Sequence, residues 1–301
     1  MFSVTILGNN SALPMHNRHP TAQVVELNEV AFLVDCGEGA QSQMNHFKIR
    51  RSRINHIFIS HLHGDHYFGL PGLLNSFSLI GREDDLHLYA PKQLESILQQ
   101  IFDAADNTLS YKLHFHPLPT EGLILDEKKI TVTCFPVHHR IACWGFMFKE
   151  KEKPRRVNNE KCIELNIPSS FYGDLKLGKD FIHPNGDVVK NEWVTISPSP
   201  ARSYAYCADT KYDESFLPFV KDADLLYHET TYLSIDDVKA TLRYHSTTHQ
   251  AARFAQKANV KRLLIGHFSS KYAQLEQFLE ETKSIFPQTE LAIEGTSFFI
   301  R

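Results

Sequence analysis

Three histidines and one aspartate stand within six consecutive residues of the chain, in the run His61-Leu-His63-Gly-Asp65-His66. The apolar residues before this run predict a buried strand that ends where the run begins. Imidazole and carboxylate groups are the ligands that zinc takes in hydrolytic sites. We expect His61 and His63 to face one metal ion, and Asp65 and His66 to face a neighbouring ion. Gly64 would let the backbone bend sharply between the two pairs.

Four residues of one loop cannot complete two metal sites, so further ligands have to come from distant parts of the chain. His139, Asp209 and His267 are suitable, because each follows the carboxyl end of a predicted strand, where α/β folds place their sites. A rigid strand can aim such a side chain accurately. His138 stands next to His139 and is a rival ligand. Singly these residues have structural explanations, but together with the loop they supply the ligand types that two ions need.

Strand-like and helix-like segments alternate along both halves of the chain. Strands are expected at residues 3–7, 23–26, 30–35, 54–60, 86–89, 130–136, 203–208, 225–228, 262–266 and 291–294. Helices are expected at residues 41–47, 67–80, 92–105, 247–258 and 273–286. Many of the strands alternate apolar and polar residues, which favours sheets that pack one face on helices and the other on a second sheet.

Between the two halves lies a segment of different character, Lys149 to Trp193, which is rich in Lys, Arg, Asn, Pro and Gly. Its residues 149–156 hold five basic side chains against two acidic ones. A long surface connection with a solvated charged face is one explanation. A structureless stretch of this length is uncommon inside a compact domain, however, and is usually functional. We therefore expect an inserted arm.

The composition is that of an ordinary globular protein: of 301 residues, 42% are hydrophobic and 22% charged, and the formal net charge is -3. Binding of a polyanion would need a local basic patch. The five cysteines include no C-x-x-C pair, which argues against a disulfide framework and for buried thiols in a reducing compartment. Met1 to Gly8 lacks a basic signal-peptide region and no run is long enough to span a membrane, so we expect a cytoplasmic protein.

Several motifs together resemble the metallo-β-lactamase superfamily, namely the histidine-rich run, Cys207-Ala-Asp209-Thr210 and Gly266-His267. The resemblance is closest to one family in it, ribonuclease Z, the tRNA 3′-processing endonucleases. The motifs that carry this likeness are Leu33-Val-Asp35-Cys-Gly-Glu-Gly-Ala-Gln41, Phe68-Gly-Leu-Pro-Gly-Leu73, His228-Glu229-Thr-Thr-Tyr232 and His245-Ser246-Thr247. The likeness covers essentially the whole chain, the arm region included.

The resemblance implies an α/β fold, the αβ/βα four-layer sandwich, with residues 1–301 as a single domain and residues 149–193 as an inserted tRNA-binding arm. It also implies two zinc ions (Zn2+) per subunit. One ion is held by His61, His63 and His139, the other by Asp65, His66 and His267, and Asp209 bridges them. Relatives tend to have Asp-His-Gly-Ile-Pro where this chain has His138-His139-Arg-Ile-Ala142, and the register of the isoleucine favours His139 over His138.

Three residues receive catalytic roles from the resemblance. Asp65 is the expected proton acceptor, His245 would donate a proton to the leaving 3′ oxygen, and Glu229 would orient His245. Asp35 would steer a metal ligand by hydrogen bonding. From the residues alone His245 has another explanation, as a helix-entry residue whose neighbours Ser246 or Thr247 cap the helix.

The function that the resemblance implies is removal of the 3′ trailer from precursor tRNA, in which hydroxide attacks a phosphodiester and leaves a tRNA 3′-hydroxyl. The arm would bind the tRNA backbone through Lys151, Lys153, Arg155 and Arg156. Relatives commonly form homodimers, so we expect a homodimer here. Two alternatives are a non-catalytic RNA-binding subunit and another binuclear zinc hydrolase of the same fold, acting on a small phosphodiester, thioester or lactone.

Overall fold

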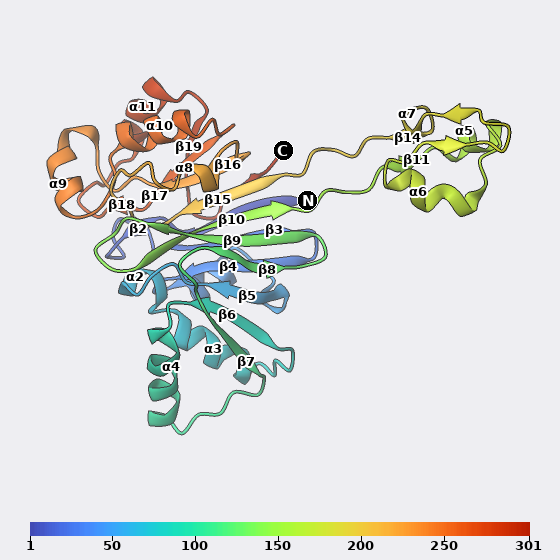
Figure 1. The fold of residues 1–301 in the computed structure, drawn as a ribbon. Coiled ribbons are helices and arrows are strands. Elements are labelled where there is room, and N and C mark those ends of the chain that lie inside the picture. The colour runs from blue at the N-terminus through green and yellow to red at the C-terminus, as the bar shows by residue number, and fades with distance from the viewer. The chain divides into compact units, whose positions relative to one another are not determined.

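Two seven-stranded β-sheets lie face to face in the larger part of the chain, so most of their strands are buried on both sides (Figure 1). The computed structural model describes residues 1–301. Contacts divide them into a main unit, Met1–Lys149 with Arg202–Arg301, and a second unit, Glu150–Ala201. Both large sheets are built by the main unit.

The first sheet combines an antiparallel half with a parallel half. Its strands, in spatial order, are β20 (Ser297–Phe299), β1 (Phe2–Gly8), β3 (Ala22–Leu27), β4 (Val30–Cys36), β5 (Ile54–Phe58), β6 (Leu86–Ala90) and β7 (Leu113–Pro117). Pairing is antiparallel from β20 to β4 and parallel from β4 to β7. Helices α1 (Ala40–His46), α3 (Leu70–Leu79) and α4 (Gln93–Ala104) cover its outer face, where their apolar residues share one buried cluster with the sheet.

The second sheet is arranged in the same way. Its strands, in spatial order, are β19 (Thr289–Leu291), β17 (Leu263–Gly266), β16 (Leu225–Glu229), β15 (Ser203–Cys207), β10 (Cys143–Glu150), β9 (Ile130–Val137) and β8 (Gly122–Asp126). Strands β15, β16, β17 and β19 are parallel to one another. Helices α8 (Leu217–Val220), α10 (Thr248–Lys257) and α11 (Glu276–Ile285) pack on its outer face.

A core of aromatic side chains joins the two sheets. Phe58 stacks on Tyr89 with 4.8 Å between ring centroids and meets Phe146 of the opposite sheet at 5.4 Å. Each such side chain, fully buried, contributes about 1.5–3 kcal/mol of hydrophobic free energy. With helices on both outer faces, this is the α/β four-layer sandwich expected from the sequence, and Figure 1 shows the layers in the main unit.

Short elements complete the main unit. They are β2 (Asn10–Ser11), which pairs in parallel with β18 (Phe268–Ser269), the turns η1 (Arg51–Arg53) and η3 (Ser234–Asp236), and helices α2 (Gly64–Tyr67) and α9 (Asp237–Leu242). None of the helices has the length and apolar character that crossing a membrane requires. The five cysteines are buried free thiols, as their spacing predicted.

Most predicted elements are confirmed to within a few residues. Most of the missed strands of the two large sheets lie where the apolar pattern is weak, but β10 is an exception, because its residues are mostly apolar and buried. The helix expected at 67–80 is two helices, α2 and α3, and the strand expected at 291–294 is β19, which ends at Leu291. Strands β7, β8, β10 and β20 were not predicted. Three of these, β7, β8 and β20, are the outermost strands of their sheets and are mostly half-buried or exposed, so they carry little hydrophobic periodicity.

The second unit, residues 150–201, folds around a small core of its own. Its elements are β11 (Arg156–Val157), α5 (Asn159–Glu164), η2 (Ser169–Phe171), α6 (Tyr172–Lys176), β12 (Phe181–Ile182), β13 (Val188–Val189), α7 (Asn191–Val194) and β14 (Thr195–Ile196). Cys162, Leu175 and Val194 are fully buried in it. The buried Asn191 amide donates to the carbonyls of Leu175 and Lys179 at 2.8 and 2.9 Å. The weakly periodic segment is therefore folded, in elements too short to show a clear pattern.

Candidate metal centre

The metal-binding side chains gather where strands of both sheets end. His61 follows β5 and His139 follows β9, while Asp209 and His267 follow the parallel strands β15 and β17. Glu229 is the last residue of β16, which lies between those two strands. Since carboxyl ends of parallel strands meet at one edge of a sheet, residues far apart in the sequence become neighbours.

One group of ligand atoms comes from His61, His63, His139 and Asp209. His61 Nε2 lies 3.0 Å from His63 Nδ1, which lies 3.1 Å from His139 Nε2. Asp209 Oδ2 lies 3.6 Å from His61 Nε2 and 3.9 Å from His139 Nε2. Ligands of a tetrahedral zinc ion are about 3.4 Å apart, so these four atoms suit one such ion.

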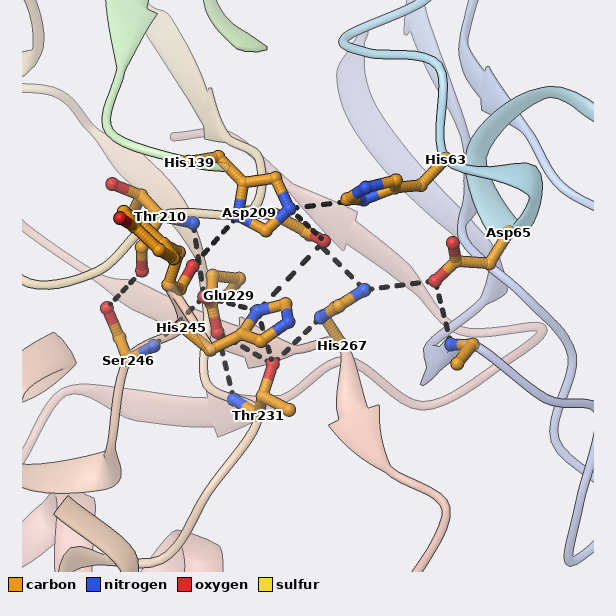
Figure 2. Close-up of polar contacts among 12 residues, drawn as sticks. His63, Asp65, His139, Asp209, Thr210, Glu229, Thr231, His245, Ser246 and His267 are labelled. Carbon is orange, nitrogen blue, oxygen red and sulfur yellow. Dashed lines mark hydrogen bonds and ion pairs between the residues drawn. The ribbon is translucent and has the colours of Figure 1, made fainter. Parts of the chain in front are cut away.

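A second group comes from Asp65, His66 and His267. Their ligand atoms are 3.4 to 3.7 Å apart, and Asp209 Oδ1 lies 3.4 Å from His66 Nε2 and 3.2 Å from His267 Nε2. Asp209 therefore turns one oxygen to each group, as Figure 2 shows for its contacts with the surrounding histidines. Asp209 Oδ1 is buried without a hydrogen-bond donor, a costly state for a carboxylate oxygen that a metal ion would relieve. The chain thus has a metal-binding site with a carboxylate shared between two ligand groups.

Burial opposes charge throughout this centre, and neighbours decide the outcome for each group. Burial lowers the pKa of His61. Burial raises the pKa of Asp65 and Asp209, but His66 and His267 outweigh it and hold both carboxyl pKa values below their usual range. The surrounding carboxylates raise the pKa of His66 against the effect of its burial. A bound cation would replace the proton of His66, so metal binding and protonation are linked here.

Four of the histidines have the outer ring nitrogen fixed by an acceptor. His66 Nδ1 donates to Asp35 at 2.7 Å, and His139 Nδ1 donates to the Tyr244 carbonyl at 2.9 Å. The other two use hydroxyls, His61 with Ser60 Oγ at 3.0 Å and His267 with Thr231 Oγ1 at 2.9 Å. Each hydroxyl donates its own proton to a carboxylate, so it accepts from the ring. All four Nε2 atoms therefore keep a lone pair for a metal ion.

Ser60 and Thr231 are the members of this outer layer that the sequence analysis did not identify. Both stand beside residues that it did identify, Ser60 before His61 and Thr231 two positions after Glu229. A hydroxyl has many possible partners, and only the folded positions of the carboxylates show which proton it gives and which it takes.

Asp35 is one of two heavily used acceptors of the centre. Its buried carboxylate accepts hydrogen bonds from Ser60 N, Ser60 Oγ, His66 Nδ1 and Tyr206 Oη at 2.6 to 2.8 Å. Asp35 has a φ of 55° and His267 a φ of 62°, a left-handed conformation that is unfavourable for residues other than glycine. Such strain persists only where surrounding contacts hold it, and here it serves to aim a ligand and its partner.

The histidine-rich run differs from its prediction in one respect. Asp65 and His66 do not lie on a loop but in the first turn of α2, which starts at Gly64. Gly64 has no left-handed φ, and the backbone changes direction at His63, where the extended conformation gives way to the helix. A Cβ at this position would come within 2.3 Å of the Phe68 ring, so glycine is required here to make room for that side chain.

Glu229 connects three loops beside the metal-binding groups. Its buried carboxylate accepts from the amides of Thr210, Thr231 and Ser246 at 2.9 to 3.1 Å, and from His245 Nδ1 at 3.0 Å. Burial opposes protonation of His245, but Glu229 outweighs it and raises the pKa of His245 to about 8. Figure 2 shows His245 directed toward Glu229 and Thr231. Helix α10 is capped by Thr247, as the helix-entry explanation of His245 expected, but that explanation does not account for the contact between His245 and Glu229.

The remaining histidines lie outside this centre. His138 pairs with Asp213 at 3.2 Å and is half exposed, whereas its neighbour His139 is in the ligand group. His56, His87 and His114 are direct neighbours across β5, β6 and β7, and their rings stack at 5.1 and 4.7 Å. Nitrogen atoms of stacked rings lie in parallel planes and do not converge on one ion. This second group of histidines is therefore a structural ladder.

A cavity of about 770 Å³ opens beside the metal-binding groups. His63, Asp65, His139, Asp209 and His245 contribute to its wall. Its other lining residues include the basic side chains Arg140 and Arg243 and the apolar side chains Leu13, Pro14 and Phe68. The cavity thus offers ionised, basic and apolar surfaces next to one another.

The chain is similar to known proteins along its whole length. A curated ribonuclease Z from Bacteroides thetaiotaomicron is 44% identical over 296 residues, which cover 98% of this chain and 94% of the relative. A ribonuclease Z from Cytophaga hutchinsonii is 42% identical over 302 residues, covering 99% of this chain and 96% of that protein. A family model described as "Anti-Pycsar protein Apyc1" matches residues 2–152, which include the histidine-rich run but neither Asp209 nor His267.

Solved structures have the same fold. The crystal structure of the short form of human tRNase Z has a TM-score of 0.73 and 26% identity, with 99% of each chain covered. A metallo-β-lactamase fold protein of Bacillus subtilis, YhfI, has a TM-score of 0.70 and 19% identity, with 99% of this chain and 98% of that chain covered. At that identity the second likeness shows the fold alone, which is the metallo-β-lactamase fold.

Replacing Asp35 by alanine is expected to weaken metal binding without removing a ligand. The change frees the His66 ring and leaves the Ser60 and Tyr206 donors without their acceptor. Loss of such an outer partner costs about 10- to 100-fold in metal affinity, measured by competition with a chromophoric chelator. Asp84→Ala, at an exposed position, is the matched control. An Asp35→Ala protein that keeps both fold and metal affinity would show that the carboxylate does not position His66.

Proposed function

The chain belongs to the ribonuclease Z family, and we propose that it is a zinc-dependent endoribonuclease that removes the 3′ trailer from precursor tRNA and leaves a 3′-hydroxyl on the tRNA. The observation that carries the proposal is the shared carboxylate of Asp209 between two ligand groups, with the Glu229–His245 pair beside it. Two adjacent metal sites next to a protonated imidazole suit the displacement of an oxygen from a phosphodiester.

Two zinc ions per subunit are part of the proposal. His61, His63 and His139 would hold one, Asp65, His66 and His267 the other, with Asp209 as the bridge. The separations of the ligand atoms and the mixture of imidazole and carboxylate support zinc in both places. Zinc supplies Lewis acidity, which makes a water nucleophile available at neutral pH and offsets the charge that builds up on the phosphate.

Asp65 is proposed to accept the proton of the attacking water. It lines the cavity. Its Oδ2 accepts from the Ala12 amide at 2.7 Å and faces His66 and His267, and Oδ1 takes part in none of these contacts. Its lowered pKa keeps the carboxylate ionised, so a proton acceptor is present at neutral pH. The tethered Oδ2 fixes the orientation of the group, which acid–base catalysis requires.

His245 is proposed to give a proton to the leaving 3′ oxygen. Its Nδ1 is held by Glu229, which leaves Nε2 for the substrate, and the residue lines the cavity. Because Glu229 raises the pKa of His245 to about 8, the ring carries a proton at neutral pH. An alkoxide is a poor leaving group, so protonation of the 3′ oxygen as the bond breaks lowers the barrier.

The second unit is proposed to hold the body of the tRNA. Lys153 and Arg156 are exposed there, and Lys151 and Arg155 are half-buried. Arg155 Nε donates to Thr195 Oγ1 at 2.7 Å and so also positions β14. Basic side chains on a separately folded unit suit contacts to the backbone of a folded RNA, whose shape rather than sequence is accessible. This unit, Glu150–Ala201, is the proposed exosite; it contains all of the expected arm, residues 149–193, except Lys149, and extends it to Ala201.

The alternatives from the sequence are not favoured. A binding-only subunit has no need of a complete ligand set, yet every expected ligand lies in one of the two groups. A hydrolase of thioesters or lactones could use the same metals, but the overall likeness to ribonuclease Z extends through residues that lie outside the metal centre. The second unit is also larger than a small substrate would require.

A homodimer in the cytoplasm is also proposed. Leu79 and Ile80 are 78% and 62% exposed at the end of α3, and Ile235, Val238 and Leu242 are exposed around α9, so the main unit has apolar surface that a second copy could cover. The mass of the protein in solution tests this part of the proposal. The buried free cysteines are consistent with a reducing compartment.

Cleavage of a precursor tRNA with a 3′ trailer is the direct test of the function. The purified protein is expected to contain close to two equivalents of zinc, to release the trailer and to leave a 3′-hydroxyl, as mapped by sequencing of the product ends. Chelation should abolish cleavage and zinc should restore it, and Asp65→Ala should remove activity while the fold persists. Cleavage by metal-free protein would contradict the mechanism, and a zinc-loaded protein that spares every precursor would contradict the substrate.

The loss of activity on replacing His245 by alanine should depend on the leaving group of the substrate. On precursor tRNA, where an alkoxide leaves, kcat/KM is expected to fall by about 100- to 10,000-fold. On bis(p-nitrophenyl) phosphate, whose phenolate leaves without a proton, the loss should be under about tenfold. Glu229→Gln should show the same pattern to a smaller extent. Equal losses of His245→Ala on both substrates would mean that the residue has a structural role only.

Removing the second unit should separate RNA binding from chemistry. Because Lys149 and Ser203 are direct partners on antiparallel strands, a two-residue Asn-Gly turn can replace residues 151–201. Hydrolysis of bis(p-nitrophenyl) phosphate should stay within about twofold, while kcat/KM for precursor tRNA falls on the order of 100-fold with a weaker salt dependence.

A milder version of this test keeps the second unit folded. The double substitution Lys153→Ala with Arg156→Ala should raise KM for precursor tRNA, whereas Lys128→Ala with Lys129→Ala, two exposed lysines of the main unit, should not. Equal effects of the two pairs on precursor tRNA, or loss of the small substrate on deletion, would contradict a separate RNA-binding unit.

A further inference from the structure

Phe68 is an exposed aromatic side chain on the wall of the metal-site cavity. It is 65% exposed and follows directly on α2, the helix that carries Asp65 and His66. Single exposed apolar residues are common on protein surfaces, so exposure alone needs no explanation. The position of Phe68 needs an explanation, because the residue is three positions after Asp65 and lines the cavity in which a substrate must lie.

The ring of Phe68 is held in place by its own helix. The nearest ring atom lies 2.3 Å from the position that a Cβ on residue 64 would take. The ring therefore rests directly on the Gly64 backbone. The Phe68 amide donates to the Gly64 carbonyl at 3.0 Å, and the Tyr67 ring meets Phe68 edge-on at 5.0 Å. One face of the ring is therefore fixed before any ligand binds. The exposed part can contact a ligand without a further loss of side-chain conformational freedom.

The cavity wall on this side is apolar. Leu13 and Pro14 line it together with Phe68. Their loop is tied to the metal centre, because the Ala12 amide donates to Asp65 Oδ2 at 2.7 Å. Basic side chains also line the cavity, namely Arg243, two positions before His245, and Arg140, whose guanidinium contacts His63 Nε2 at 3.2 Å, and Glu38 adds one carboxylate. One cavity thus combines a flat apolar surface with a basic one, a combination that matches a nucleobase joined to phosphate.

The direction of the RNA follows from the bond that breaks. The nucleotide whose 3′ oxygen leaves has to lie beside His245, which protonates that oxygen. The trailer nucleotide keeps the phosphate on its 5′ oxygen and extends to the other side of the metal-binding groups. Figure 2 shows Asp65 and His245 on opposite sides of Asp209 and His267. Phe68 directly follows the short helix that carries Asp65, and its ring lies against Gly64 of that helix, which assigns Phe68 to the trailer side.

We propose that Phe68 is a stacking platform for the base of the first trailer nucleotide and so positions the scissile phosphate over the metal centre. This inference rests on the proposed function. Stacking on an aromatic ring tolerates any base, which suits trailers of varied sequence. Phe68 is a positioning residue, because it touches the substrate away from the reacting atoms.

The test combines a protein change with a substrate change. Wild type, Phe68→Ala and Phe68→Trp are assayed on a precursor tRNA with a natural first trailer nucleotide and on one with an abasic nucleotide there. On the natural substrate Phe68→Ala should lower kcat/KM by about 5- to 100-fold, and Phe68→Trp should stay within about threefold of wild type. On the abasic substrate Phe68→Ala and wild type should be equal within about twofold. Phe299→Ala, an exposed phenylalanine of β20 outside the cavity, is the matched control and should behave as wild type.

Three results would overturn the proposal. One is an equal loss for Phe68→Ala on the natural and abasic substrates, which would mean a structural role. Another is a loss for Phe68→Trp as large as that for Phe68→Ala. The third is that Phe68→Ala and wild type become equal only when the abasic nucleotide is the last one of the mature tRNA. That result would place the ring on the wrong side of the cut. Unchanged zinc content in the variants excludes damage to the metal centre, and failure of wild type to cut any precursor would refute the function itself.

Discussion

The buried carboxylate of Asp35 is the contact on which the geometry of the metal centre depends. It accepts four hydrogen bonds, and their donors come from the loop after β5, from the metal ligand His66 and from Tyr206 on the opposite sheet. One side chain thus fixes a ligand, the loop that carries another ligand, and the spacing of two sheets. An acceptor that satisfies four donors at once cannot be replaced without leaving several of them unpaired, at about 1–3 kcal/mol each.

Glu229 holds His245, the proposed proton donor, as Asp35 holds His66, a candidate metal ligand. Each carboxylate is fully buried, each collects backbone and side-chain donors, and each orients one histidine. The ring nitrogens are therefore oriented by the protein alone, before any metal ion contributes. What the protein leaves unpaired is Asp209 Oδ1 and the inward lone pairs of the histidines. Metal binding supplies the missing partner, which couples the stability of this edge of the fold to the metal.

How far the sequence predicts such a centre depends on how local each feature is. The run from His61 to His66 is local, and the positions of Asp209 and His267 follow from strand ends, so these residues could be named in advance. The shared use of Asp209 was expected only from the resemblance to a family. The role of Thr231 and the reason for Gly64 could not be named in advance, because each depends on which segments pack together. The same holds for the fold. Runs of apolar residues predict the buried strands, whereas edge strands such as β7 and β20 contain too few apolar residues to be predicted.

Recognition and chemistry are separated in this chain to different degrees. Residues 150–201 have their own core and leave the second sheet between two directly paired residues, Lys149 and Ser203, so their surface can change without disturbing a ligand. The wall formed by Phe68 has no such freedom. Its ring rests on Gly64 of the short helix that carries Asp65 and His66, two of the candidate metal ligands. If residues 150–201 hold the RNA body as proposed, their contacts to RNA can change independently of the metal centre, whereas the proposed stacking surface of Phe68 is built next to it.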